Sequence, residues 1–207
     1  TYSKIVENYT FNNSYSDYKN FKSYSGEMLF RPVYIPLPNG RGKITYIDGS
    51  TYEGYISMGN PQGTNGKMIY ANGDVYIGGW NEDKYNGFGV LTTKDGSSYE
   101  GNWKAGIMEG KGKYTFSDGA VYEGDFENNI LNGYGTFTWP NGDKFSGIYN
   151  ANIRMKGELR WNNGDIYIGE FENSLCHGNG KKIYANGVVE DGYWENNKFI
   201  SKIYNDV

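Results

Sequence analysis

The chain has little of what most catalytic and metal sites are made from. It contains one cysteine, Cys176, and one histidine, His177, among 207 residues. A single cysteine excludes an internal disulfide and is typical of a reducing compartment. The two residues are too few for a zinc-type site, and as neighbours on a strand they would point to opposite faces, which disfavours a catalytic dyad. No phosphate-loop or nucleophile-elbow motif occurs. We therefore expect no enzyme activity, no metal and no cofactor.

Long apolar runs and basic clusters are also missing. No segment approaches the roughly 18 apolar residues of a membrane span, and no signal peptide is recognisable. The formal net charge is −4. The close pair Lys111 and Lys113 is expected to be solvated, opposite acidic residues such as Glu123 and Asp125 on a neighbouring strand. Nucleic acid binding is disfavoured and a cytoplasmic location is favoured. The chain begins at Thr1 rather than Met, which fits a piece of a longer protein.

Glycine and aromatic residues, by contrast, are abundant and regularly spaced. The chain has 31 glycines, 21 tyrosines, 10 phenylalanines and 5 tryptophans. Three positions before an aromatic residue or its equivalent, an Asp-Gly or Asn-Gly pair occurs seven times, and the glycines of these pairs are 24, 23, 23, 23, 22 and 23 residues apart. These glycines are Gly49, Gly73, Gly96, Gly119, Gly142, Gly164 and Gly187. A fixed period in this range predicts a tandem array in which each unit packs on its neighbours.

Each unit contains two segments that alternate with period two, which predicts two strands. The first is exemplified by Tyr76-Ile77-Gly78-Gly79-Trp80 and the second by Gly87-Phe88-Gly89-Val90-Leu91. One face of each strand is aromatic and the other polar. Glycine inside a strand is costly unless its missing side chain is needed. We therefore expect each glycine to leave a gap into which a neighbouring ring lies flat.

Turn chemistry and length variation constrain the hairpins further. A two-residue Asn-Gly turn would place Tyr70 and Tyr76 on opposite faces, so we predict an odd loop with glycine in the left-handed region, followed by a bulge. All insertions and deletions fall between the first-strand and second-strand glycines. This distance is twelve residues from Gly54 to Gly66 and ten from Gly147 to Gly157. The segment is therefore interpreted as the variable surface loop.

The expected fold is all-β: an elongated single-layer antiparallel sheet of stacked β-hairpins. Residues 1–23 lie outside the repeat and are interpreted as an N-terminal arm or cap. Residues 24–49 read as a degenerate first repeat interrupted by prolines, and residues 50–199 as the tandem repeats. Residues 200–207 form a cap strand or tail, which either covers the last unit or pairs with its copy in a second molecule.

Tyr99-Glu100-Gly101-Asn102-Trp103 and Tyr167-Ile168-Gly169-Glu170-Phe171, the latter followed by His177-Gly178-Asn179-Gly180, resemble the MORN (membrane occupation and recognition nexus) repeat. The resemblance covers residues 24 to about 199. The chain departs from the pattern where Met155 replaces the first glycine and Ile56 replaces the Trp. What the resemblance implies is a scaffold or adaptor in cytoskeletal or membrane-associated assemblies, or a targeting array beside a lipid kinase or methyltransferase domain.

The aromatic face supplies the candidate binding residues. They are Trp80, Trp103, Phe126, Tyr149, Phe171 and Trp194 at one position of the repeat, with Trp139 and Trp161 at another. Two interpretations stay open. The rings pack on one another as the core, or part of the row forms a groove for a partner helix or peptide. The function expected is a non-catalytic protein-interaction scaffold, with self-association considered. The alternative is a phospholipid-associating, membrane-targeting regulatory array of a larger enzyme.

Overall fold

The computed structural model describes residues 2–10, 21–31 and 34–202. Every regular element in this part of the chain is a β-strand, and the strands separate into two units, Thr1–Ile107 and Met108–Val207. The strands of the first unit are β1 (Tyr2–Thr10), β2 (Phe21–Arg31), β3 (Tyr34–Tyr46), β4 (Thr51–Ser57), β5 (Asn60–Ile69), β6 (Val75–Asn81), β7 (Lys84–Thr92) and β8 (Ser98–Lys104). The strands of the second are β9 (Ile107–Thr115), β10 (Val121–Glu127), β11 (Ile130–Thr138), β12 (Lys144–Asn150), β13 (Ile153–Arg160), β14 (Ile166–Glu172), β15 (Leu175–Ile183), β16 (Val189–Glu195) and β17 (Lys198–Lys202).

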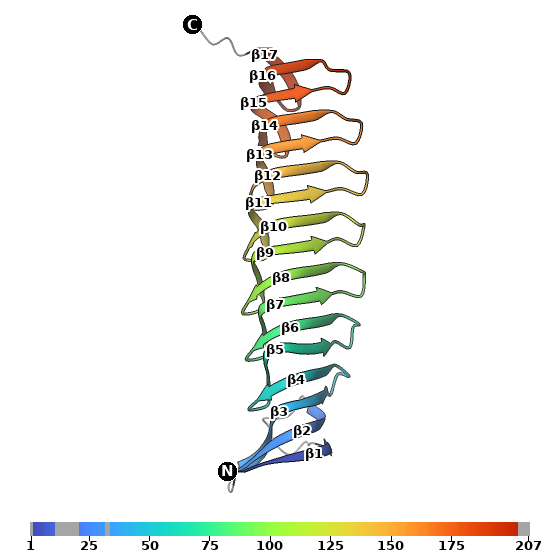
Figure 1. Cartoon of the computed structure of the whole chain (residues 1–207), viewed down its shortest axis with the longest axis vertical. Coiled ribbons are helices and arrows are strands. Elements are labelled where there is room, and N and C mark those ends of the chain that lie inside the picture. Colours follow the sequence, from blue (N-terminus) through green and yellow to red (C-terminus); the bar gives the residue numbers. More distant parts are fainter. Residues whose placement is uncertain (1, 11–20, 32–33, 203–207) are drawn as a thin grey trace. The chain divides into compact units, whose positions relative to one another are not determined.

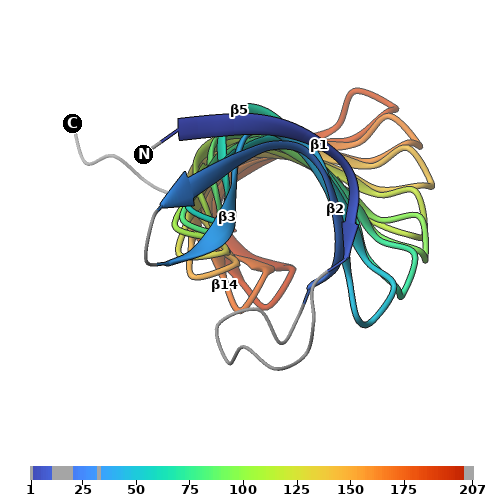
Figure 2. The same cartoon turned by 90° about the horizontal axis from the view of Figure 1, so that it is seen from below.

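Within each unit, every strand pairs antiparallel with the strand that follows it, as in β6 with β7 and β14 with β15. Figure 1 shows the resulting succession of hairpins. The strands are bent along their length, as β2 and β3 show in Figure 2. The all-β antiparallel hairpin fold predicted from the sequence is confirmed.

The Asn-Gly turns have the predicted odd loop. In the turn after β5, the Tyr70 N–H donates to the carbonyl of Asp74 at 2.9 Å, and the Gly73 N–H donates to the carbonyl of Tyr70 at 2.9 Å. Gly73 has φ +98°. This is a three-residue loop, a type I turn closed by a left-handed glycine. Because Met68 is paired with Tyr76 and Tyr70 lies two residues further along, Tyr70 and Tyr76 share a face.

The other ends of the hairpins are not the variable loops that the length changes suggested. They are tight two-residue turns with positive φ at both positions, such as Asn128 (φ 51°) and Asn129 (φ 67°) between β10 and β11. Positive φ at both residues identifies type I′ turns, which suit the twist of the flanking strands. The expectation of a variable loop is therefore wrong. The two strands of each such hairpin run up to the turn, and only two residues connect them, as between Glu127 of β10 and Ile130 of β11.

Bulges, rather than loops, absorb the length variation. Where Gly54 and Gly66 are twelve residues apart, the register between β4 and β5 changes from the pair Glu53 and Lys67 to the pair Tyr55 and Gln62. In the shortest repeat, Ile148 pairs with Lys156 and Tyr149 with Arg154, which is a smaller change of register. A bulge bends and twists the strand and leaves the turn at its end unchanged.

The core of each unit is a column of rings over glycines. Gly78 faces Gly89 across β6 and β7. A Cβ atom on Gly78 would lie 2.7 Å from the Tyr76 hydroxyl, and one on Gly89 would lie 2.6 Å from the Tyr76 Cζ. The ring of Tyr76 therefore occupies the space that both glycines leave, as expected. The same position is at most 1% exposed in seven repeats, at Tyr24, Tyr52, Tyr76, Tyr99, Tyr122, Phe145 and Tyr167.

The ends of the chain lie partly outside the described residues. β1 pairs with β2, while residues 11–20 of the expected N-terminal arm are not described. At the other end, β17 pairs with β16, so Lys198–Lys202 completes a hairpin, and residues 203–207 are not described. The interpretation of these two segments as caps stays a prediction.

Candidate functional site

Six of the eight candidate binding residues lie in the core. Their side chains are at most 7% exposed: Trp80, Trp103, Phe126, Tyr149, Phe171 and Trp194. The indole N–H groups are satisfied internally, since Trp80 Nε1 donates to the carbonyl of Gly66 at 3.2 Å and Trp194 Nε1 to that of Gly180 at 2.9 Å. Their burial supports the interpretation of these rings as core. As a surface for a partner they are not accessible, because each ring is enclosed by rings of the same and the preceding repeat.

The enclosure is built from edge-to-face contacts. The ring of Trp103 meets Tyr99 at a centroid distance of 4.9 Å and Tyr76 at 5.7 Å, at interplanar angles of 84° in both cases. In the second unit, Phe171 meets Tyr167 at 5.2 Å and Phe145 at 5.3 Å. Such T-shaped pairs place the positive edge of one ring against the negative face of another. They join successive repeats into one continuous core within each unit.

Trp139 and Trp161 are different, because both are half-buried. They directly follow the second strands β11 and β13, just before the glycine turns. The Arg154 guanidinium lies 5.3 Å from the Trp139 ring centroid and 5.3 Å from that of Phe171. The Arg154 Nη2 also donates to the carbonyl of Ser174 at 2.8 Å. A guanidinium stacked on rings and satisfied by a carbonyl is held in place on this face.

Lys182 lies over two further rings of this face in the same way as Arg154. Its Nζ atom lies 4.8 Å from the Trp161 ring centroid and 4.4 Å from that of Tyr184, and 3.6 Å from Asp165 Oδ2. The name aromatic inner row is used for the half-buried rings on this face of the second unit: Phe116, Phe137, Trp139, Trp161 and Tyr184. It combines these half-buried rings with two cations, Arg154 and Lys182.

The corresponding face of the first unit is rich in tyrosine and acid. Tyr70 and Tyr85 are joined by a 2.5 Å contact between their hydroxyl oxygens, and Tyr85 stacks on Tyr76 at a centroid distance of 3.6 Å. Tyr70 precedes a glycine turn and Tyr85 follows a type I′ turn. Their contact shows that both ends of the bent strands approach each other over this face.

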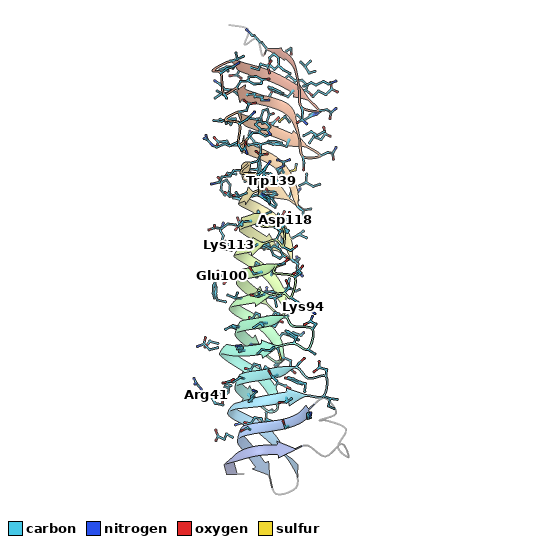
Figure 3. The ribbon with its side chains drawn as sticks, turned by 90° about the vertical axis from the view of Figure 1, so that its right-hand side faces the viewer. Arg41, Lys94, Glu100, Lys113, Asp118 and Trp139 are labelled. Atoms are coloured by element: carbon cyan, nitrogen blue, oxygen red, sulfur yellow. The ribbon has the colours of Figure 1, made fainter. Side chains whose placement is uncertain are left out.

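The opposite face is polar and carries cross-strand charge pairs. Lys111 Nζ lies 2.7 Å from Asp125 Oδ1, and Lys113 is paired with Glu123 on the next strand. Lys181 Nζ lies 3.4 Å from Asp191 Oδ2. The expectation that the lysines lie opposite acidic strand positions is confirmed. Exposed pairs of this kind contribute little to stability, and they indicate a solvated face. Figure 3 shows Arg41 and Glu100 of the first unit projecting on this side, with Lys94 at a turn.

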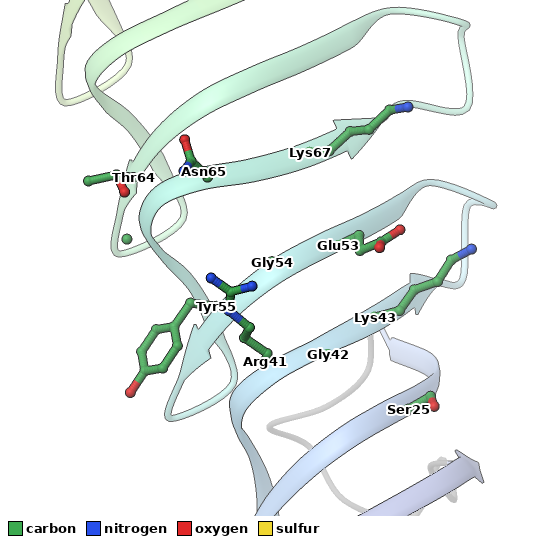
Figure 4. A pocket seen from close by; sticks show the side chains of 11 residues that line it. Ser25, Arg41, Gly42, Lys43, Glu53, Gly54, Tyr55, Thr64, Asn65 and Lys67 are labelled. Carbon is green, nitrogen blue, oxygen red and sulfur yellow. The ribbon is translucent and has the colours of Figure 1, made fainter.

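An open pocket lies on the polar face of the first unit (Figure 4). Lys43, Glu53 and Lys67 form one cross-strand row beside it, and Arg41 is paired with Tyr55 in the next row. Thr64 and Asn65, from the longest bulge, form its rim. Because Glu53 lies between the two lysines, its charge offsets theirs, and the pocket resembles the solvated rows elsewhere on this face.

The single cysteine and histidine do not act together. Cys176 is buried and pairs with Phe171 on the inner side, and burial raises the pKa of its thiol to about 11. The thiol is therefore protonated at neutral pH. His177 Nε2 lies 3.2 Å from Glu172 Oε2, and its ring meets Tyr193 edge-on. Among the described residues, no group of three or more His, Cys, Asp or Glu residues is placed to hold a metal ion. The described part also contains no helix that could cross a membrane.

The chain belongs to the MORN repeat family, since the MORN repeat model matches residues 37–51, 52–75, 76–98, 99–121, 122–144 and 167–189. The unmatched stretch between 144 and 167 contains Met155 in place of glycine, yet β12 and β13 form the same hairpin there. No curated protein matches the chain.

The solved structures similar to this chain include the following three. The TCP domain of Drosophila melanogaster SAS-4, in complex with a proline-rich motif of Ana2, has 17% identity and a TM-score of 0.46, covering 78% of this chain and 92% of that domain. A mutant TCP10 domain of Danio rerio CPAP has 14% identity and a TM-score of 0.44, with coverages of 80% and 82%. The CPAP G-box domain has 15% identity and a TM-score of 0.42, with coverages of 81% and 98%.

Sequence reasoning missed the residues that come after the type I′ turns. Tyr85 and Arg154 are the second residues after their turns, and both contact the rings of the inner face. Because length variation predicts a surface loop in this segment, none of its side chains is expected to face inward. The signal that identifies them is an Asp or Asn at the second position of the hairpin tip, Asp83 before Tyr85 and Asn152 before Arg154, which fixes the register of the second strand.

Proposed function

We propose that this chain is a non-catalytic scaffold or adaptor whose partner is another protein, bound as a helix or peptide on the aromatic inner row of the second unit. The observation that carries the proposal is the half-buried pair Trp139 and Trp161 with Arg154 and Lys182 beside them. Tryptophan and arginine dominate the energy of protein interfaces because they offer large apolar area with a polar edge. A structural ring has no need of solvent contact, and the six core rings have almost none.

The absence of a catalytic role is part of this proposal. The thiol of Cys176 is buried and protonated at neutral pH, and Asp125 and Asp191 of the polar face are paired with lysines. The proposed location is the cytoplasm, with association to the cytoskeleton, since the one cysteine suits a reducing compartment. The proposal includes homodimer formation of the scaffold. Light scattering of the same samples measures the molar mass that tests it.

The test compares three forms of the full chain in co-purification with quantitative mass spectrometry. The double variant Trp139→Ser with Trp161→Ser removes the two half-buried indole rings, and Tyr134→Ser is the matched control, since Tyr134 is 55% exposed on the polar face of the same unit. Partners retained by Tyr134→Ser and lost by the double variant support the proposal. Equal partner sets for all three folded proteins would contradict it.

Sedimentation with vesicles tests the competing role in membrane targeting. At physiological salt, a scaffold for proteins stays in the supernatant with vesicles of neutral or anionic phospholipid. Membrane attachment would need clustered cations or an inserting apolar surface. Sedimentation with anionic vesicles that is independent of Trp139 and Trp161 would favour the phospholipid-associating array instead.

A further inference from the structure

Arg154 is a charged residue at a position of the repeat that is otherwise uncharged. It pairs with Tyr149 across β12 and β13, so its side chain lies on the face of the core rings. In five other hairpins the residue that pairs with the corresponding core residue is uncharged: Pro61, Tyr85, Leu131, Cys176 and Phe199. A guanidinium on this inner face is unfavourable unless the groups around it compensate for the water it has lost.

The fold compensates for this guanidinium only in part. Its Cζ atom lies 5.3 Å from the ring centroid of Trp139, 5.4 Å from that of Phe145 and 5.3 Å from that of Phe171. Its Nη2 atom donates to the carbonyl of Ser174 at 2.8 Å, and within the described residues this carbonyl is its single hydrogen-bond acceptor. A guanidinium has five N–H donors. The protein therefore holds the group in place but uses few of its donors.

No carboxylate of the described residues forms an ion pair with Arg154. The other cation of this face, Lys182, has Asp165 Oδ2 at 3.6 Å from its Nζ atom. Among the described side chains, the one buried nitrogen or oxygen atom without a hydrogen bond is Nδ1 of His177. The unbonded nitrogen atoms of Arg154 are therefore not enclosed, and they reach solvent beside the half-buried ring of Trp139.

This arrangement fits a carboxylate better than other anions. A carboxylate accepts two parallel hydrogen bonds from a guanidinium, and partial removal from water strengthens the attraction between the two charges. Of the two cations on this face, Lys182 is already neutralised by Asp165. The single charge of Arg154 therefore matches one carboxylate rather than the two negative charges of a phosphate group.

We propose that Arg154 binds the carboxylate of a glutamate or aspartate side chain of the partner, while apolar side chains beside that acid pack on Trp139 and the neighbouring rings of the aromatic inner row. The inference rests on the proposed function and adds the chemistry of the partner, which is an acidic residue within an apolar segment. A basic segment would meet a like charge at the same place, so Arg154 also selects against it.

The experiment titrates the full chain with short peptides and follows its tryptophan indole signals by NMR. The probe is Gly-Leu-Glu-Leu-Gly with both ends blocked, and its matched control replaces glutamate by glutamine, which keeps the shape and removes the charge. A third peptide, Gly-Leu-Gln-Leu-Gly with a free carboxyl terminus, offers a carboxylate from the chain end. We expect saturable shifts of the Trp139 indole with the glutamate peptide and binding weaker by about tenfold with the other two.

Arg154→Leu tests the residue itself. Leucine stands at this position in the preceding repeat, as Leu131, so the variant should fold, which circular dichroism verifies. It should bind the glutamate and glutamine peptides equally. Arg160→Leu is the matched control, because Arg160 is an exposed arginine of the same strand, and it should keep the wild-type preference for glutamate.

Equal binding of the glutamate and glutamine peptides by the wild-type chain, or an unchanged preference in Arg154→Leu, would overturn the proposal. Tighter binding of the free-carboxyl peptide than of the glutamate peptide would overturn the assignment to a side chain. The co-purification test at Trp139 and Trp161 is read separately. Partners lost in that test, without a preference for glutamate in the titration, would leave the aromatic inner row as the binding surface and remove only the role of Arg154.

Discussion

The indole N–H of Trp103 donates a hydrogen bond of 3.2 Å to the carbonyl oxygen of Gly89. Gly89 lies on β7, beside the strand that carries Trp103, and it also leaves space for the Tyr76 ring. One glycine thus serves two aromatic residues, one through its missing side chain and one through its carbonyl. The repeat is stable because ring, gap and acceptor recur with the same spacing.

Replacing Gly89 with alanine should therefore destabilise the fold. The added Cβ would meet the buried ring of Tyr76, which is packed against Tyr85 and Trp80 and has no room to move. Overpacking of this kind costs about 1–3 kcal/mol. Thr92→Ala on the same strand, at an exposed position, should change stability by less than about 0.5 kcal/mol. Urea denaturation followed by circular dichroism measures both, and equal midpoints would contradict the role of the glycine.

The buried hydroxyl of Tyr122 should contribute to the stability of the fold through its hydrogen bond. It donates to the carbonyl of Asp125 at 3.0 Å, as Tyr99 does to Asn102 at 3.0 Å. Tyr122→Phe leaves that carbonyl without this donor and should lower the free energy of unfolding by about 1 kcal/mol. The loss should be no larger, since Phe145 fills the same position in its own repeat. Tyr134→Phe on the exposed face is the control, and a larger loss there would argue against this assignment.

Two substitutions of Asn129 separate the contributions of its side-chain hydrogen bond and of its backbone conformation to stability. Its side chain accepts from the Met108 N–H, and its backbone has φ 67°. Asn129→Gly keeps the left-handed conformation and removes the acceptor, for an expected loss of about 1 kcal/mol. Asn129→Ala adds backbone strain and should cost about 1 kcal/mol more. Thermal unfolding should rank the proteins as wild type, Gly variant, Ala variant. A reversed order of the two variants would contradict the assigned conformation.

Much of this arrangement could be predicted from the sequence, because period and turn chemistry are local. The three-residue loop at Asn72-Gly73 and the ring of Tyr76 over two glycines result from alternation and sterics alone. The bulges could not be predicted, since a length change between Gly54 and Gly66 looks the same whether a loop or a strand absorbs it. The accessibility of Trp139 and the burial of Trp103 depend on how sharply the strands bend, which no single repeat specifies.

Stability should depend on pH through Asp83. Its folded-state pKa is raised above the ordinary value of 3.8 by partial burial. Its protonated form is therefore favoured by folding. The stabilising effect is complete below the ordinary pKa and is lost as pH rises through the folded-state pKa. The hydroxyls of Tyr46 and Tyr52, whose pKa values Asp83 helps to raise, stay protonated in this range.

Asp83→Asn should accordingly be more stable than wild type at neutral pH and equally stable at pH values well below 3.8. Melting temperatures across this range measure the difference, and Glu100→Gln supplies the control for loss of one exposed charge. A variant that is less stable than wild type at neutral pH would show that Asp83 already has a partner within the fold.

Oxidative footprinting of the five tryptophans tests the central claim most directly. Hydroxyl radicals react with side chains according to their solvent contact, and mass spectrometry assigns the oxidation to each residue. The structure predicts rapid oxidation of Trp139 and Trp161 and strong protection of Trp80, Trp103 and Trp194, which are at most 7% exposed. Equal oxidation of all five, or protection of Trp139 and Trp161 in the isolated chain, would contradict an aromatic inner row left open for a partner.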